Sequence, residues 1–167
     1  MPLEDYFSLE SISTTELVIR MGLAAGFGFL LGFDRDSKNK PIDFRAYMIV
    51  CLTACMICIM AQELNVSLAL KDAEIVLDLG KIVSGVMTGI GFLGAGAIIH
   101  KRGPSDEQVV GTATGATIWG AGGIGLCLGF GNYLLAAVTF VIFIAILIIG
   151  GAYRHHINGN GHTENNQ

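Results

Sequence analysis

Long apolar blocks separated by short polar connections dominate the chain. The five apolar blocks are residues 15–33, 44–61, 81–99, 109–130 and 133–151. A helix needs about 20 apolar residues to cross the hydrocarbon core of a membrane, and every block is near that length. The pattern predicts an all-α integral membrane protein, a bundle of five transmembrane helices. The fourth block is rich in glycine, which leaves open a broken or re-entrant segment there.

The composition agrees with a membrane protein. Hydrophobic residues make up 52% of the 167 residues and charged residues 14%, with a mean hydropathy of +0.60. Soluble domains carry about 25% charged residues, so this chain has too little polar surface for water. The net charge is −4 and the basic residues are scattered, which excludes a basic surface for nucleic acid.

Lysine and arginine gather in alternate connections. Basic residues occupy the first connection, the third connection and the start of the C-terminal tail, at Arg35, Lys38, Lys40, Arg45, Lys101, Arg102 and Arg154. The opposite connections are nearly free of them. By the positive-inside rule, the N-terminus is outside and the C-terminus is cytoplasmic.

This topology divides the chain into three parts. Residues 1–14 form an extracytoplasmic segment, residues 15–152 the transmembrane domain, and residues 153–167 a disordered cytoplasmic tail that is polar and rich in glycine and asparagine. Residues 62–80, between the second and third spans, mix leucine with acidic residues and suggest a short amphipathic helix at the outer interface. Gly131 and Asn132 form a tight turn before the fifth span, whose bulky residues predict a lipid-facing position.

The stretch from Gly89 to Gly94 matches G-x-G-x-x-G, the spacing of a dinucleotide-binding loop. That function requires a strand before the loop and a helix after it, and here the motif lies inside an apolar span. Small residues instead let membrane helices approach closely. Five G-x-x-x-G pairs predict tight helix crossings: Gly22/Gly26, Gly28/Gly32, Gly85/Gly89, Gly111/Gly115 and Gly125/Gly129.

Ionisable groups at span ends are functional candidates. Asp34 and Arg35 end the first span and Arg45 opens the second, so the three are predicted to form a cytoplasmic cluster. The alternative is that they only anchor the helices at the interface. Glu16 and Arg20 are four residues apart and are expected to form an ion pair within the first helix.

Cysteine and histidine offer little chemistry. Cys51, Cys55 and Cys58 share one helix face, where packing is the better interpretation than a soft-metal or redox site. The histidines of the tail fit a solvated segment better than a metal site. No nucleophile–base arrangement or paired carboxylates lie within a span, so we expect no enzyme activity, no cofactor and no metal site.

Three stretches together resemble the MgtC/SapB family. They are "GFLLGFDRDSKNKPIDFRAYMIVCLTA", "SGVMTGIGFLGAGAIIHKRG" and "VVGTATGATIWGAGGIGLCLGFGNYLLAA", in the family's order and spacing. The resemblance covers residues 22–151. It implies a bacterial inner-membrane protein with five spans, linked to growth at low magnesium and to survival in host cells. Because the chain ends soon after the last span, it looks like a short form that lacks the family's C-terminal soluble domain.

The resemblance also implies site residues. The carboxylate–arginine motif of the family corresponds to Asp34 and Arg35, with Asp34 where the family usually has glutamate. The second set, implied for helix packing or a pore, is Gly89, Gly91, Phe92, Gly94, Gly96, Thr112, Thr114 and Trp119. The segments 43–47 and 111–115 depart from the family pattern, and the former keeps only Arg45.

These observations lead to one hypothesis and one alternative. The hypothesis is a homo-oligomeric, non-enzymatic modulator of membrane partners, such as the ATP synthase, or of ion balance. The alternative is a transporter or channel for magnesium or another small ion, built on glycine-broken helices. Against the alternative, no acidic residue lies deep in a span to bind a divalent cation.

Overall fold

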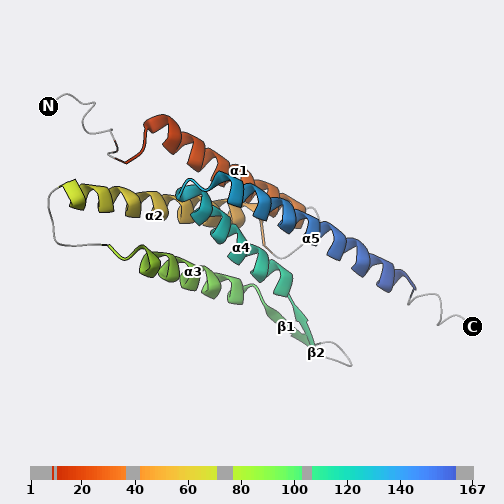
Figure 1. Ribbon diagram of the computed structural model, residues 1–167. Helices are drawn as coiled ribbons and strands as arrows, with labels where there is room; N and C mark the ends of the chain where they lie inside the picture. The colour runs from red at the N-terminus through yellow and green to blue at the C-terminus, as the bar shows by residue number, and fades with distance from the viewer. Residues whose placement is uncertain (1–8, 10, 37–41, 71–76, 103–106, 161–167) are drawn as a thin grey trace, which may run out of the picture.

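A computed structural model describes residue 9 and residues 11–36, 42–70, 77–102 and 107–160. Over these residues the chain forms five helices and one small hairpin: α1 (Thr14–Asp36), α2 (Phe44–Leu70), α3 (Leu79–Gly96), β1 (Ile99–Arg102), β2 (Glu107–Val110), α4 (Thr112–Gly129) and α5 (Tyr133–Asn160). Successive helices run in opposite directions, so the hairpin and the C-terminal end of α5 lie at one end of the bundle (Figure 1). The predicted five-helix bundle is confirmed, while the membrane side of each end stays a prediction.

Helix α4 is the centre of the bundle. It contacts all four other helices, and two thirds of its residues are buried. The other helices are long and apolar enough to span a membrane, whereas α4 is not among those that meet this criterion. Glycine, alanine and threonine lower its hydropathy, and they are what a helix surrounded by protein requires. It is one unbroken helix, which removes the broken-segment alternative for the fourth block, while its full crossing of the membrane stays a prediction.

Two glycine pairs make the predicted close crossings. A Cβ atom on Gly28 would lie 2.7 Å from the Met48 Cα, and one on Gly32 would lie 2.6 Å from the Phe44 Cα. These glycines therefore bring α1 and α2 into backbone contact. Gly125 and Gly129 do the same between α4 and α2.

Other glycines of the predicted pairs have different roles. Gly111 precedes α4 with φ +98°, and a side chain there would meet the Ala97 carbonyl. Gly115 packs against Gly94 of α3. A Cβ on any of Gly22, Gly26, Gly85 and Gly89 would meet nothing within 4 Å, so these two pairs make no crossing within the described chain.

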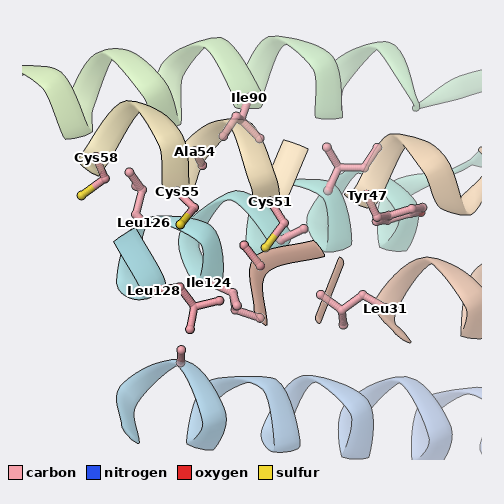
Figure 2. Packing of buried hydrophobic residues seen from close by; sticks show 14 of the residues in the cluster. Leu31, Tyr47, Cys51, Ala54, Cys55, Cys58, Ile90, Ile124, Leu126 and Leu128 are labelled. Carbon is pink, nitrogen blue, oxygen red and sulfur yellow. The ribbon is translucent and has the colours of Figure 1, made fainter. Parts of the chain in front are cut away.

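The cysteines of α2 are small packing residues at the α2–α4 crossing. Cys51, Cys55 and Cys58 are buried, and their backbone and Cβ atoms are the closest neighbours of Gly125 and Gly129. Figure 2 shows these side chains on the α2 face that carries Ala54, among Ile124, Leu126 and Leu128 of α4. Larger residues would push the two helices apart, so the packing interpretation fits this geometry.

The hairpin is a feature that the hydrophobic pattern did not predict. The third span was expected to reach residue 99, but α3 ends at Gly96 and the chain enters β1, whose Ile99 pairs with Val110 of β2. The β-branched residues Ile99, Val109 and Val110 favour strands. In the hydrophobic pattern, Ile99 looks like the end of the third apolar block, and Val109 and Val110 look like the start of the fourth.

Two helices are longer than predicted. Residues 62–70 continue α2 instead of forming a separate amphipathic helix, and α5 runs through the start of the expected disordered tail to Asn160. Extending an existing helix adds one hydrogen bond per residue without a new nucleation cost. Residues 161–167 of the tail lie outside the described residues. The tight turn before α5 is confirmed, with Gly131 at φ +75°.

Helix α5 lies at the rim, as its bulky sequence predicts. Over residues 133–151, where its burial is described, most residues are exposed, and two aromatic contacts join it to the bundle. The Phe143 ring packs on Gly120 of α4, and the Phe140 ring stacks on Phe27 of α1 at 4.6 Å between centroids.

We expect Gly28→Ala to destabilise the protein, because the added methyl group collides with the α2 backbone. Such overpacking costs about 1–3 kcal/mol. The matched control is Gly22→Ala on the same helix, where a Cβ meets no atom within 4 Å. Thermal unfolding in detergent measures both. Equal midpoints for the two variants would contradict the crossing.

Candidate functional site

The glycine-rich part of α3 crosses the start of α4 in backbone contact. A Cβ on Gly94 would lie 2.9 Å from the Gly115 carbonyl oxygen, so neither glycine can carry a side chain without separating the helices. Beside them Thr114 is only 2% exposed. Of the second set of predicted site residues, Gly94 and Thr114 therefore belong to the interior.

The rest of that set lies on the outside. Phe92 is 80% exposed and Trp119 is 51% exposed. Thr112 is exposed at the start of α4, and Gly91 packs loosely against the Trp119 ring, with 3.9 Å from a Cβ to the indole Cδ1. These residues do not line a path through the middle of the described chain.

One side of α3 carries three glycines and a phenylalanine that the described part of the chain leaves exposed. Gly85, Gly89, Phe92 and Gly96 are spaced by four, three and four residues, which places them on one face of a helix. All four are exposed, and a Cβ on each of the three glycines would meet no atom within 4 Å. We call these four residues the α3 outer face. The opposite side, with Ile90 and Gly94, packs on α4.

The predicted Asp34–Arg35–Arg45 cluster is described only in part. Asp34 and Arg35 belong to the last turn of α1, but their side chains lie outside the described residues. Arg45 binds Asp43, with 2.5 Å from its Nε to Oδ2, and its backbone nitrogen donates to Oδ1 at 3.1 Å. Asp43 thus stabilises the first turn of α2. Gly32, near the end of α1, packs against Phe44, the first residue of α2, so Arg45 lies near the end of α1.

The opposite end of the bundle holds a buried arginine. Arg20 is 7% exposed. Its Nε donates to Glu16 Oε1 at 3.0 Å, and its Nη1 donates to the Gly129 carbonyl at 2.6 Å. The predicted Glu16–Arg20 pair is confirmed, but it is only one part of the arrangement.

Two further residues complete this Arg20 cluster. Gln62 of α2 donates to the same Gly129 carbonyl at 2.7 Å, and the Tyr133 hydroxyl of α5 lies 3.4 Å from Glu16 Oε1. Carbonyls in the last turn of a helix lack helical partners and carry partial negative charge, which a guanidinium satisfies. The cluster therefore ties α1, α2 and α5 to the C-terminal end of α4.

Sequence reasoning missed this role of Arg20 because its partner on α4 is a backbone carbonyl 109 positions away. The available signal was an arginine well inside an apolar block, which is costly unless it has partners. Within the part of the chain that is described, no three His, Cys, Asp or Glu side chains come together as a metal site.

Comparison with known protein families identifies the family of this chain. The model of the MgtC family matches residues 21–155. The chain belongs to the MgtC family. No solved structure matches the chain.

Several relatives carry names. This MgtC-family chain is 31% identical to Protein SapB of Bacillus subtilis over 80% of its own length and 55% of that protein. It is 29% identical to the "Putative magnesium transporter YhiD" of Escherichia coli K12, over 80% and 60%. It is 27% identical to Protein MgtC of Salmonella typhimurium, over 82% and 54%. The chain thus spans little more than half the length of these relatives.

We expect Arg20→Ala to lower the free energy of unfolding by about 2–3 kcal/mol, because the Gly129 carbonyl loses a charged donor. Glu16→Gln keeps an oxygen acceptor and should cost less. Chemical denaturation in detergent micelles measures both variants. If Arg20→Ala matched the wild type, the cluster would not hold the helices together.

The pKa of Asp43 is lowered, first by the side-chain hydrogen bond from Arg45 and then by the backbone one. A lowered folded-state pKa stabilises the fold above the unfolded value of 3.8, and the contribution disappears as pH falls through the folded value. We expect Arg45→Gln to raise the pKa of Asp43 toward 3.8. A carboxyl NMR titration measures this change, and an unchanged pKa would contradict the pair.

Proposed function

We propose that this MgtC-family protein is a non-enzymatic modulator of membrane partners or of ion balance in the bacterial inner membrane, in adaptation to low magnesium or host stress. The observation that carries the proposal is the α3 outer face. Three open glycines on a membrane helix offer close backbone approach to another helix. By contrast, α5 exposes many bulky residues, such as Leu134, Val141 and Ile149, that suit lipid.

The partner on this face is a transmembrane helix, from a second copy of the chain or from another membrane protein. The resemblance to the family favours the ATP synthase as one such partner. Phe92 projects from the middle of the face and gives the contact an apolar anchor. Trp119 is also exposed, on the neighbouring helix, and extends the apolar surface beside α3.

The cytoplasmic residues Asp34, Arg35 and Arg45 are proposed to bias the arrangement of α1 and α2. The backbone contact between Gly32 of α1 and Phe44 of α2 supports this. Because the two helix ends touch there, a small shift of one helix end moves the other helix as well. An Asp34→Asn variant that kept assembly and the cellular phenotype would reduce this cluster to an interface anchor.

The second candidate function is magnesium transport, which the name of the relative YhiD favours. A transported Mg²⁺ ion needs oxygen ligands in near-octahedral geometry. In this chain the buried side chains of α4 are apolar apart from Thr114 and Thr117, and the Thr117 hydroxyl donates to the Ala113 carbonyl at 2.6 Å. This interior gives more support to the modulator.

We expect no saturable magnesium entry into sealed liposomes that contain the purified protein and an internal magnesium dye. Protein-free vesicles and the Asp34→Asn variant are the controls, and protease protection verifies insertion. Saturable entry that the variant loses would overturn the modulator proposal and establish transport.

A second arm of this test distinguishes an active modulator from an inert protein. In a deletion strain at low magnesium, the wild type and Gly22→Leu should restore growth, whereas Gly89→Leu should not. Both glycines are exposed and open, so both leucines fit the fold. Growth restored by Gly89→Leu would remove the α3 outer face from the proposal.

A further inference from the structure

The β1–β2 hairpin extends the two shortest helices of the bundle. α3 and α4 have 18 residues each, whereas α1, α2 and α5 have 23, 27 and 28. At 1.5 Å per residue, α3 and α4 are about 27 Å long and the other three measure about 34 Å or more. The hydrocarbon core of a bilayer is about 30 Å thick, so the two helices that fall short of it are the two that the hairpin joins (Figure 1).

An ion pair marks the opposite end of α3. Asp78 accepts a hydrogen bond from the Lys81 backbone nitrogen at 3.1 Å, and its carboxylate lies 3.6 Å from the Lys81 Nζ. Both side chains are exposed, and charged groups are costly in hydrocarbon, so this end of α3 lies at a membrane surface. Counted to Gly96 from Leu79 or from Lys81, α3 covers about 27 or 22 Å, which leaves about 3–8 Å of the core beyond Gly96. Any tilt of the helix increases this shortfall.

The chain after α3 is apolar over this remaining depth. Ile98, Ile99, Val109 and Val110 are between 36% and 51% exposed, and Ile99 pairs with Val110 across the hairpin. We call these four residues the hairpin base. A strand rises about 3.3 Å per residue, so the base extends about 7 Å past the helix end. Its length therefore matches the part of the hydrocarbon core that α3 does not reach.

The hairpin base also continues an apolar surface of α3. Leu93 and Ala95, in the last turn of that helix, are exposed and lie outside the α3 outer face. Ile98 and Ile99 follow them directly along the chain. Because α3 is long and apolar enough to span a membrane, the surface that continues from it faces the same lipid.

The backbone of the hairpin limits how deep the base can lie. In the described part of the chain the sheet has two strands, so each strand has one outer edge that no third strand pairs with. Polar backbone groups at an open edge need hydrogen-bond partners that hydrocarbon does not provide. The apolar side chains thus favour the core and the strand edges favour water and head groups. The two requirements are met together at the boundary between hydrocarbon and head groups.

We propose that the hairpin base is a lipid contact that completes the third and fourth spans. Its four apolar side chains insert among the acyl chains of the nearer leaflet, and its strand edges reach the head-group layer. The third apolar block then records the depth of the membrane, which is why it extends to residue 99 although α3 ends at Gly96. The inference depends on the chain spanning a membrane and not on the proposed function of the α3 outer face.

Fluorescence quenching tests the proposal with the full chain in phosphatidylcholine liposomes whose acyl chains are brominated either near the head group or near the chain end. Trp119 is the only tryptophan, so Trp119→Phe gives a background without tryptophan emission. In that background, Val109→Trp reports on the hairpin base. We expect lipid brominated near the head group to reduce this emission most, lipid brominated near the chain end to reduce it less, and aqueous acrylamide to have little effect.

The matched control is Val141→Trp in the same background, at an exposed position of α5. Residue 141 lies about 12 Å along α5 from Tyr133, near the middle of the core, so the order of the two brominated lipids should reverse.

A further variant combines Val109→Trp with Ile99→Asp. A carboxylate is costly at this depth, so the quenching should shift from brominated lipid to acrylamide. This variant separates the effect of the apolar base from the preference of an indole ring for the membrane interface. If Val109→Trp fails to fold by circular dichroism, Ile98→Trp replaces it, since Ile98 is also exposed.

Three results would overturn the proposal. Quenching of Val109→Trp by acrylamide without quenching by brominated lipid would place the hairpin base in water. Quenching by neither would show that protein covers it, from a second copy or another partner. Unchanged quenching after Ile99→Asp would show that the indole ring alone sets the depth.

Discussion

Backbone contact around α4 is the constraint on which the rest of the structure depends. Helices in lipid gain little from hydrophobic burial against one another, so they associate through close packing and through polar groups that find partners. Here Gly115, Gly125 and Gly129 let α3 and α2 touch the α4 backbone. The small residues that permit this contact also make α4 less apolar than its neighbours, because protein surrounds it.

Arg20 supplies the polar half of the same arrangement. The carbonyls of Leu126, Cys127 and Leu128 accept backbone bonds in the turn after α4. The Arg20 guanidinium and the Gln62 amide both donate to the carbonyl of Gly129. Burying a charge is costly, but here it is offset by Glu16 and by the helix end. One end of the bundle is therefore held by hydrogen bonds, while glycine contacts hold α1 to α2 at the other.

The surfaces left over divide by residue type. Bulky residues on α5 suit lipid, and open glycines on α3 suit another helix. The chain belongs to the MgtC family, and one of its relatives is named a putative magnesium transporter. The division of surfaces supports a protein that acts through contacts in the membrane.

The sequence by itself determined the five-helix bundle, because a membrane helix requires a long apolar block and such blocks are visible one by one. It also determined the family, from three stretches in a characteristic order. The Glu16–Arg20 pair and the turn at Gly131 were visible because each depends only on residues close together in the chain. Only the tertiary structure decided which glycines pack. Gly22 and Gly28 look alike in sequence, but Gly22 faces open space and Gly28 faces the α2 backbone. The hairpin and the Arg20–Gly129 bond depend in the same way on segments brought together by folding, which no local pattern records.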